Sequence, residues 1–221
     1  MADALGKKVL KILCIHGYRQ NTNTCREKLG AFRKCVKKLP LEFVYTTAPN
    51  RIPRTITGEI ASPEENECGW WFSSPDDSYD PLAPTELCKG FEDSLELIKK
   101  TFKEQGPFDG VFGFSQGASF LSIICALRDQ GLFHFDFAIL VASFKSRSSA
   151  HDVYYQKPIT CPTLHVYGDT DKVIPKENSE ELAKLFVDPV ILNHAGGHFV
   201  PASSAQKKVY LEFLEKFVSA K

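Results

Sequence analysis

Short apolar runs alternate along this chain with segments in which apolar residues return every three or four positions. The short runs predict six β-strands, at residues 9–15, 41–46, 108–113, 135–143, 164–167 and 190–192. The helical spacing predicts helices at residues 29–39, 85–105, 116–130, 177–186 and 205–218. Continuously apolar strands separated by helices are typical of a parallel sheet that is covered on both sides. We therefore expect an α/β fold with about six mostly parallel strands and helices on both faces.

Residues 49–84 interrupt this alternation. They contain six prolines, both tryptophans of the chain and many polar residues, so we expect an irregular insertion there instead of regular elements. Long segments without regular structure are often functional loops when they occur in a compact domain. No segment has the composition of an interdomain linker, and we expect one domain spanning residues 1–221.

Charge balance and cysteine spacing narrow the range of functions. The chain has 27 lysine and arginine residues and 27 aspartate and glutamate residues, so its formal net charge is zero. This balance argues against a nucleic-acid partner, because nucleic-acid-binding proteins usually carry a basic excess. No apolar run approaches the ~20 residues of a membrane span. The run at 9–15 contains Lys11 and does not resemble a signal peptide. The seven cysteines form no C-x-x-C pair, which favours free thiols and a reducing, cytoplasmic location over a zinc ribbon or disulfides.

The strongest chemical signal is Gly113-Phe114-Ser115-Gln116-Gly117, which fits the pattern G-x-S-x-G. A predicted strand precedes it and a predicted helix follows, and a tight strand-to-helix turn of this kind exposes a nucleophilic serine at the edge of a sheet. The flanking glycines leave room for the strained turn, and the helix N-terminus favours negative charge nearby. We therefore predict that Ser115 is a nucleophile. The alternative is a glycine-rich turn with a capping serine.

A nucleophilic serine needs a base, and the base needs an orienting carboxylate. Among the six histidines, His194 and His198 flank a short loop after a predicted strand. We favour His198 as the base, because two glycines directly before it allow the loop to reach the serine. Asp169 and Asp171 follow another predicted strand. We predict Asp171 as the orienting carboxylate and Asp169 as a turn-forming residue.

Acyl transfer also needs two preorganised donors for the oxyanion of its tetrahedral intermediate. The backbone N–H of Gln116, next after the serine, is the first predicted donor. The second is expected from the loop after the first strand, which reads Ile15-His16-Gly17-Tyr18, and our candidate is the N–H of Tyr18. A triad of this kind needs no metal and no organic cofactor, so we predict none.

Four stretches of the chain resemble the FSH family of serine hydrolases and, within it, the OVCA-type esterases of animals. They are Leu13-Cys14-Ile15-His16-Gly17-Tyr18-Arg19-Gln20-Asn21, Gly69-Trp70-Trp71-Phe72, Gly113-Phe114-Ser115-Gln116-Gly117 and Gly196-Gly197-His198-Phe199-Val200-Pro201. The resemblance spans nearly the whole chain and implies a minimal α/β-hydrolase fold with esterase activity. It also implies a triad of Ser115, Asp171 and His198, in the chain order of α/β-hydrolases. The animal branch is similar to enzymes that prefer long-chain acyl esters.

The predicted reaction is hydrolysis of small-molecule carboxylic esters with medium to long acyl chains, through an acyl-enzyme. Four aromatic residues are predicted to bind the acyl chain: Trp70 and Trp71 in the insertion, Phe114 beside the serine and Phe199 beside the base. The insertion is too irregular to bury its aromatic residues in a helix core, so we expect the tryptophans in an exposed apolar patch, which usually marks a binding site. The alternative for the tryptophans is that they anchor the insertion onto the sheet. The alternatives for the protein are an acyl-protein thioesterase-like enzyme and a catalytically silent ligand-binding protein with this fold.

Overall fold

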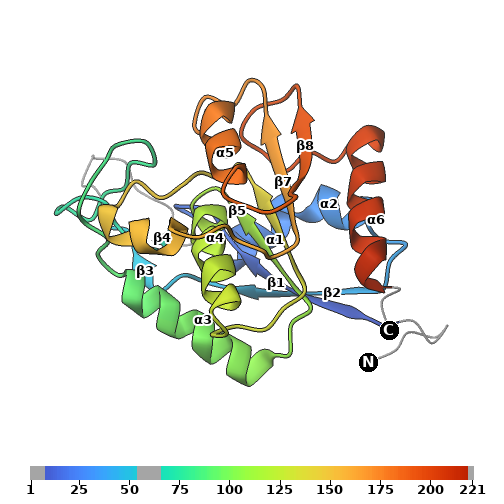
Figure 1. Cartoon of the computed structure of the whole chain (residues 1–221), viewed down its shortest axis with the longest axis horizontal. Coiled ribbons are helices and arrows are strands. Elements are labelled where there is room, and N and C mark those ends of the chain that lie inside the picture. The colour runs from blue at the N-terminus through green and yellow to red at the C-terminus, as the bar shows by residue number, and fades with distance from the viewer. Residues whose placement is uncertain (1–7, 54–65, 219–221) are drawn as a thin grey trace.

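A six-stranded sheet forms the centre of the computed structural model, which describes residues 8–53 and 66–218 (Figure 1). All neighbouring strands in this sheet are parallel, and their order is β2-β1-β5-β6-β7-β8. The strands are β1 (Leu10–Ile15), β2 (Leu41–Thr46), β5 (Gly110–Phe114), β6 (Phe137–Val141), β7 (Thr163–Gly168) and β8 (Val190–His194). Each overlaps one of the predicted apolar runs, so the predicted parallel α/β sheet is confirmed.

Helices cover both faces of the sheet (Figure 1). One face carries α3 (Phe91–Gln105), α4 (Gln116–Asp129), the 3-10 helix η1 (Ser149–Tyr155) and α5 (Lys176–Ala183). The other carries α1 (Thr22–Lys28), α2 (Gly30–Cys35) and α6 (Ser204–Val218). Successive strand side chains point to opposite faces, so a strand covered on both sides is apolar at nearly every position. No helix of the described residues is long and apolar enough to cross a membrane.

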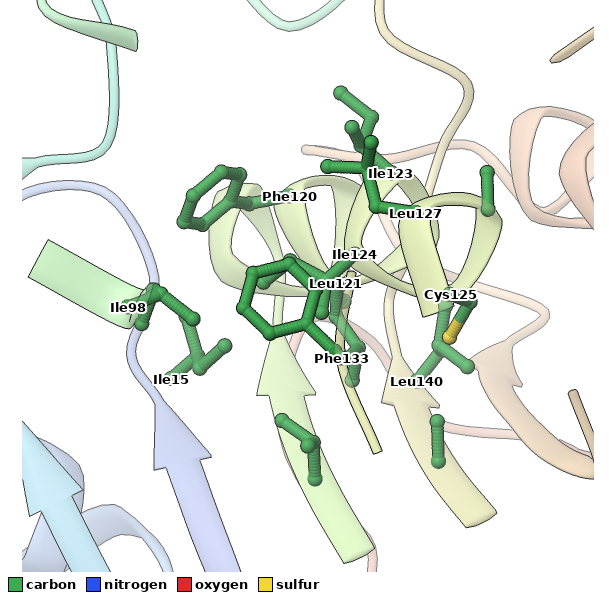
Figure 2. Close-up of a cluster of buried hydrophobic side chains, with 14 of the residues drawn as sticks. Ile15, Ile98, Phe120, Leu121, Ile123, Ile124, Cys125, Leu127, Phe133 and Leu140 are labelled. Atoms are coloured by element: carbon green, nitrogen blue, oxygen red, sulfur yellow. The ribbon is translucent and has the colours of Figure 1, made fainter. Parts of the chain in front are cut away.

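Helix α4 is the most deeply buried helix, and it determines where the rest of its layer packs. Every residue from Gln116 to Leu127 is buried. Figure 2 shows Leu121 and Ile124 of this helix between it and the sheet, close to Ile15 of β1 and Leu140 of β6. On its outer side, α4 is covered by η1, α3 and the insertion. Because α4 is buried on every side, it cannot rotate or slide without losing apolar contacts. Its first turn therefore keeps a fixed position relative to the strands.

The structure differs from the predicted helices near the start of the chain. The predicted helix at 29–39 is shorter, as α2 at Gly30–Cys35, and the preceding helix α1 at Thr22–Lys28 was not predicted. Helix α1 begins early because the side chain of Asn21 accepts the N–H groups of Asn23 and Thr24, while the Thr24 hydroxyl accepts the N–H of Asn21. This is a capping box, a strong signal for a helix start that our apolar spacing did not include.

Two more helices differ from the prediction. Helix α3 begins at Phe91 and not near Thr85, and Leu87, which we expected on its inner face, is 41% exposed. Gly90 precedes the helix with φ of 82°, a left-handed conformation that few other residues adopt. The 3-10 helix η1 was not predicted at all.

The insertion contains more regular structure than expected. Its described parts, residues 49–53 and 66–84, include β3 (Asn50–Arg51) and β4 (Cys68–Gly69), which pair antiparallel. Isolated bridges join Cys68 to Gln20 and Phe72 to Lys89. Apart from these two-residue strands and bridges, the described part is irregular as expected, and it is bound to the loop after β1 on one side and to the start of α3 on the other.

His165 is a buried histidine in the middle of β7. Its ring packs edge-on against Phe186, with ring centroids 4.7 Å apart. Neither ring nitrogen has a hydrogen-bond partner within the described residues. Burial lowers the pKa of His165 to about 3, because the charged ring has no water or partner to stabilise it.

We expect the variant His165→Leu to make folding less sensitive to acid. An unfolded histidine takes up a proton below its ordinary pKa of about 6.5, whereas folded His165 stays neutral until about pH 3, so stability falls as pH drops through this window. Each pH unit removes about 1.4 kcal/mol per histidine of this kind. Between pH 7.5 and pH 5, the free energy of unfolding measured with urea should fall by about 2 kcal/mol less in the variant than in wild type. The exposed His134, changed to leucine, is the control. Equal losses in wild type and His165→Leu would contradict the assignment.

Candidate active site

The candidate site lies where two neighbouring strands lead to helices on opposite faces of the sheet. Strands β1 and β5 are neighbours, but β1 leads to α1 on one face and β5 leads to α4 on the other. In open α/β sheets, ligands bind at the carboxyl ends of the strands where such a reversal occurs. Gly17 and Tyr18 follow β1, and Ser115 follows β5. The topology therefore brings the predicted nucleophile and the predicted oxyanion loop to the same edge.

Ser115 has an unusual backbone conformation, with φ of 54° and ψ of −120°. Residues with a side chain rarely adopt such a positive φ, because the Cβ atom collides with the backbone. Hydrogen bonds hold it on both sides. Its N–H donates to the carbonyl of Val141 at 2.9 Å, and its carbonyl accepts the N–H groups of Ala118 and Ser119 at 2.9 and 3.0 Å. Ser115 is thus fixed between the end of β6 and the first turn of α4.

The two glycines of the pentapeptide are required by close backbone contacts. A Cβ atom at Gly113 would lie 2.7 Å from Cα of Ala118. A Cβ atom at Gly117 would lie 2.2 Å from the carbonyl oxygen of His16. Both distances are far below van der Waals contact. The G-x-S-x-G spacing therefore reflects how tightly β5, α4 and the end of β1 pack around the serine.

Three side chains far apart in the sequence form one chain of hydrogen bonds. Nε2 of His198 lies 3.1 Å from Oγ of Ser115, and Nδ1 of His198 lies 2.8 Å from Oδ2 of Asp171. The other carboxylate oxygen, Oδ1, accepts the N–H groups of Val173 and Ile174, both at 2.8 Å. An ionised carboxylate only accepts hydrogen bonds, so it selects the histidine tautomer with its proton on Nδ1. Nε2 is then an acceptor that faces the serine hydroxyl.

The charge of Asp171 is supported by its surroundings. Burial raises the pKa of this carboxyl group, but hydrogen bonds from His198 and from the N–H groups of Ile174 and Val173 outweigh burial and leave the pKa below its ordinary value. The group is therefore a carboxylate at neutral pH. Its two oxygens bind the loop backbone on one side and the imidazole of His198 on the other, which fixes the orientation of the ring.

The loops that carry Asp171 and His198 are bound to each other. The N–H of Asp169 donates to the carbonyl of His194 at 2.8 Å, and the N–H of Thr170 donates to that of Gly196 at 3.2 Å. Gly168 packs so closely that a Cβ atom there would lie 2.1 Å from the carbonyl oxygen of Gly196. The loop after β7 and the loop after β8 therefore hold a fixed relative position.

The two residues weighed against the predicted acid and base lie outside the hydrogen-bonded chain. The carboxylate of Asp169 is exposed and forms an ion pair with Lys176 at 3.1 Å. Nδ1 of His194 accepts the N–H of Gly196 at 3.1 Å, and burial lowers the pKa of this histidine. His194 therefore shapes the loop that carries His198.

The loop after β1 lies directly beside the serine. A Cβ atom on Gly17 would lie 3.0 Å from the ring of Phe114 and 3.3 Å from Cβ of Ser115. Within residues 8–53 and 66–218, neither the N–H of Tyr18 nor the N–H of Gln116 has a hydrogen-bond acceptor. Both predicted oxyanion donors are therefore unpaired donors close to the serine.

His16, which precedes this loop, is a neutral structural residue. Its Nε2 accepts the N–H of Ala48 at 2.9 Å, so its proton is on Nδ1, which donates to the carbonyl of Gly17 at 2.7 Å. Burial lowers the pKa of His16 to about 4. The ring therefore stabilises the turn that leads to Tyr18.

Trp70 and Trp71 do not form the exposed apolar patch that we predicted. They are 0% and 1% exposed. The ring of Trp70 packs on those of His16 and Phe120, each with centroids 5.1 Å apart. The prediction that these tryptophans bind substrate rested on their exposure and is wrong. They anchor the insertion onto α4 and the end of β1, which was the alternative.

The other two aromatic residues lie next to the hydrogen-bonded chain. The ring of Phe114 is 6% exposed and packs against the imidazole of His198, with centroids 4.9 Å apart. Phe199 is 51% exposed. Val173, which follows Asp171 by two residues and was not among the predicted substrate-binding residues, is 48% exposed.

Comparisons with known proteins agree with this geometry. The family model described as "Serine hydrolase (FSH1)" matches residues 6–210. Esterase OVCA2 of Xenopus tropicalis is 48% identical to this chain over 223 residues, covering 98% of this chain and 96% of that protein. Esterase OVCA2 of Homo sapiens is 39% identical over 223 residues, covering 96% of this chain and 98% of that protein.

Solved structures with low sequence identity share the fold. The crystal structure of esterase PE8 has a TM-score of 0.62 at 19% identity, covering 98% of this chain and 96% of that one. Zea mays acyl-protein thioesterase 2 has a TM-score of 0.63 at 17% identity, covering 97% and 96%. The predicted α/β-hydrolase fold is confirmed. Because the family model matches residues 6–210 of this chain and its relatives are named as esterases, the chain belongs to the FSH1 family of serine hydrolases and is a carboxylic ester hydrolase.

Proposed function

We propose that the protein hydrolyses carboxylic esters through an acyl-enzyme on Ser115, with His198 as general base and Asp171 as its orienting carboxylate. The observation that carries this proposal is the unbroken hydrogen-bonded chain, with 3.1 Å between Ser115 Oγ and His198 Nε2 and 2.8 Å between His198 Nδ1 and Asp171 Oδ2. Hydrogen-bond contact of nucleophile, base and orienting group is what nucleophilic catalysis requires.

The reaction follows from these positions. His198 removes the proton of Ser115 as the hydroxyl oxygen attacks the ester carbonyl carbon, and the N–H groups of Tyr18 and Gln116 stabilise the resulting oxyanion. His198 then gives the proton to the leaving alcohol, and the acyl group remains on Ser115. A water molecule then attacks the acyl carbon while His198 takes its proton, and His198 returns this proton to Ser115 Oγ as the bond to the acyl group breaks and the carboxylic acid leaves. Asp171 stays ionised and stabilises the imidazolium in both steps.

We further propose that medium to long acyl chains are preferred. The buried tryptophans no longer support this preference, and the support comes from exposed apolar side chains beside the triad. Phe199 and Val173 are 51% and 48% exposed, next to the base and the acid respectively. Burying each methylene of a substrate against such side chains contributes about 0.8 kcal/mol.

The first test is covalent labelling of Ser115. A fluorophosphonate should add to Ser115 Oγ, and peptide mass spectrometry should find the adduct on the peptide that contains it. Ser115→Ala should lose labelling and several orders of magnitude of esterase kcat, because the remaining oxyanion donors supply only residual catalysis. Ser119, a buried serine one turn further along α4, is the matched control when changed to alanine. A label on another residue would contradict the proposal.

The second test separates the two histidines of the loop after β8. His198→Ala should lower kcat/KM by about 10⁴-fold or more, since it removes the general base. His194→Ala should stay within about tenfold of wild type, since it loses only a hydrogen bond that shapes the loop. Steady-state hydrolysis of a soluble ester is the measurement. An inactive His194→Ala with an active His198→Ala would reverse the assignment.

The third test measures kcat/KM against acyl length, from acetyl to palmitoyl esters and the matching thioesters. We expect kcat/KM to rise with chain length, and Phe199→Ser to flatten this rise. The control is Leu132→Ser, which alters a similarly exposed side chain, 46%, beyond the far end of α4. That end lies about 20 Å from Ser115, given a rise of about 1.5 Å per residue. A profile that peaks at acetyl, or an unchanged profile in Phe199→Ser, would remove the preference, and higher rates on thioesters would reassign the substrate class.

A further inference from the structure

The segment Cys68–Trp71, called here the bridging segment, contacts both loops that carry the proposed oxyanion donors. Its first contact is with the loop after β1. Cys68 accepts the N–H of Arg19 at 3.1 Å and donates its own N–H to the carbonyl of Gln20 at 3.0 Å. These two bonds hold the chain directly after Tyr18, which carries one of the donors.

Trp70 hydrogen-bonds to both loops. Its indole binds the loop after β1, and its backbone N–H binds Gln116, which follows Ser115. Its indole Nε1–H donates to the carbonyl of His16 at 2.7 Å. His16 precedes Tyr18 in the sequence, whereas the Cys68 bonds are made to the two residues that follow Tyr18. The backbone N–H of Trp70 donates to Oε1 of Gln116 at 2.9 Å. Nε2 of Gln116 in turn donates to the carbonyl of Trp71 at 2.8 Å. The Gln116 side chain is completely buried, so these bonds are shielded from water.

The bridging segment is itself anchored from behind. Nδ2 of Asn50 donates to the carbonyls of Gly69 and Trp70 at 3.2 and 3.1 Å. The hydroxyl of Ser94, in α3, donates to the carbonyl of Trp70 at 2.5 Å. Three hydrogen bonds thus hold the segment from behind, and loss of the Ser94 bond alone leaves the two from Asn50 in place.

Strands β1 and β5 are paired as far as Ile15 and Gly113, and beyond these residues the two loops meet by direct packing. A Cβ atom on Gly17 would lie 3.0 Å from the ring of Phe114 and 3.3 Å from Cβ of Ser115, so these side chains limit how closely the loops approach. Van der Waals contact does not resist separation to the same degree, because each atom pair contributes only about 0.1–0.2 kcal/mol. Hydrogen bonds that run from one loop through the bridging segment to the other do resist it.

We propose that the bridging segment sets the separation of the two oxyanion-hole N–H groups, with the indole N–H of Trp70 and the carboxamide of Gln116 as positioning groups. This inference rests on the proposed function. Neither side-chain group touches the ester. Because the oxyanion forms only on the way to the tetrahedral intermediate, loss of this positioning lowers kcat and leaves KM nearly unchanged.

The test compares two variants with one control. Trp70→Phe keeps a packed aromatic ring and loses the Nε1–H donor to His16. Gln116→Met keeps the approximate volume and loses both carboxamide bonds. The control Ser94→Ala removes a hydrogen bond of the same segment to α3 without touching either donor loop. If Gln116→Met does not fold, Trp70→Phe alone decides the outcome.

Three quantities are measured for each protein, at a temperature where urea unfolding shows it to be folded. They are kcat, KM and the Ki of a trifluoromethyl ketone, which forms a tetrahedral oxyanion on the serine. We expect kcat to fall about 10- to 100-fold in each variant and Ki to rise by a similar factor, with KM changed by less than about threefold. The double variant should fall by less than the product of the single effects, because both groups control the same distance. Ser94→Ala should keep kcat and Ki while losing stability.

Two results would overturn the inference and leave the proposed function intact. One is an active wild type in which Trp70→Phe and Gln116→Met keep normal kcat and Ki. The other is a Ser94→Ala variant that loses kcat as much as they do, since general loosening of the insertion would then explain all three. A wild type that neither hydrolyses esters nor binds the trifluoromethyl ketone would instead contradict the proposed function.

Discussion

Ser115 stays in a backbone conformation that costs about 1–3 kcal/mol for a residue with a side chain, and much of the surrounding structure holds it there. The end of β6 accepts its N–H, and the first turn of α4 binds its carbonyl. Helix α4 is buried on every side from Gln116 to Leu127, so it cannot shift to relax the turn. The strain is thus sustained by the hydrophobic core, and the serine hydroxyl keeps its direction at the sheet edge.

The core could be predicted well from the sequence because its physical signal is local. A strand covered on both faces is apolar at nearly every position, and this holds for β1, β5 and β6. The hydrogen-bonded residues at the sheet edge could also be chosen, because each lies in the loop or turn after a strand: Ser115 after β5, Asp171 after β7 and His198 after β8. In a parallel sheet, residues at the carboxyl ends of strands meet at one edge whatever their separation in the sequence.

The rest depended on long-range contacts that sequence composition does not encode. Trp70 and Trp71 were expected at the surface because their segment has no regular pattern, yet their backbone polar groups are satisfied by side chains distant in the sequence, from Asn50 and Gln116. With those partners, an irregular segment can be buried without unpaired polar atoms. Helix α1 was missed for a different reason. Its start is encoded by the capping side chain of Asn21, and only Cys25 within it is buried, so no apolar stripe identifies it.

The close contact between Gly168 and Gly196 has a consequence for recombination among relatives of this chain. The loops after β7 and β8 are complementary surfaces, joined through Asp169, Thr170 and the carbonyls of His194 and Gly196. A chimera with its crossover between these loops would combine two halves shaped by different ancestors. One with its crossover before β7 would inherit both loops from a single parent. Functional chimeras should therefore have their crossovers outside the stretch from β7 to the loop after β8, because the carboxylate and its histidine then come from the same parent.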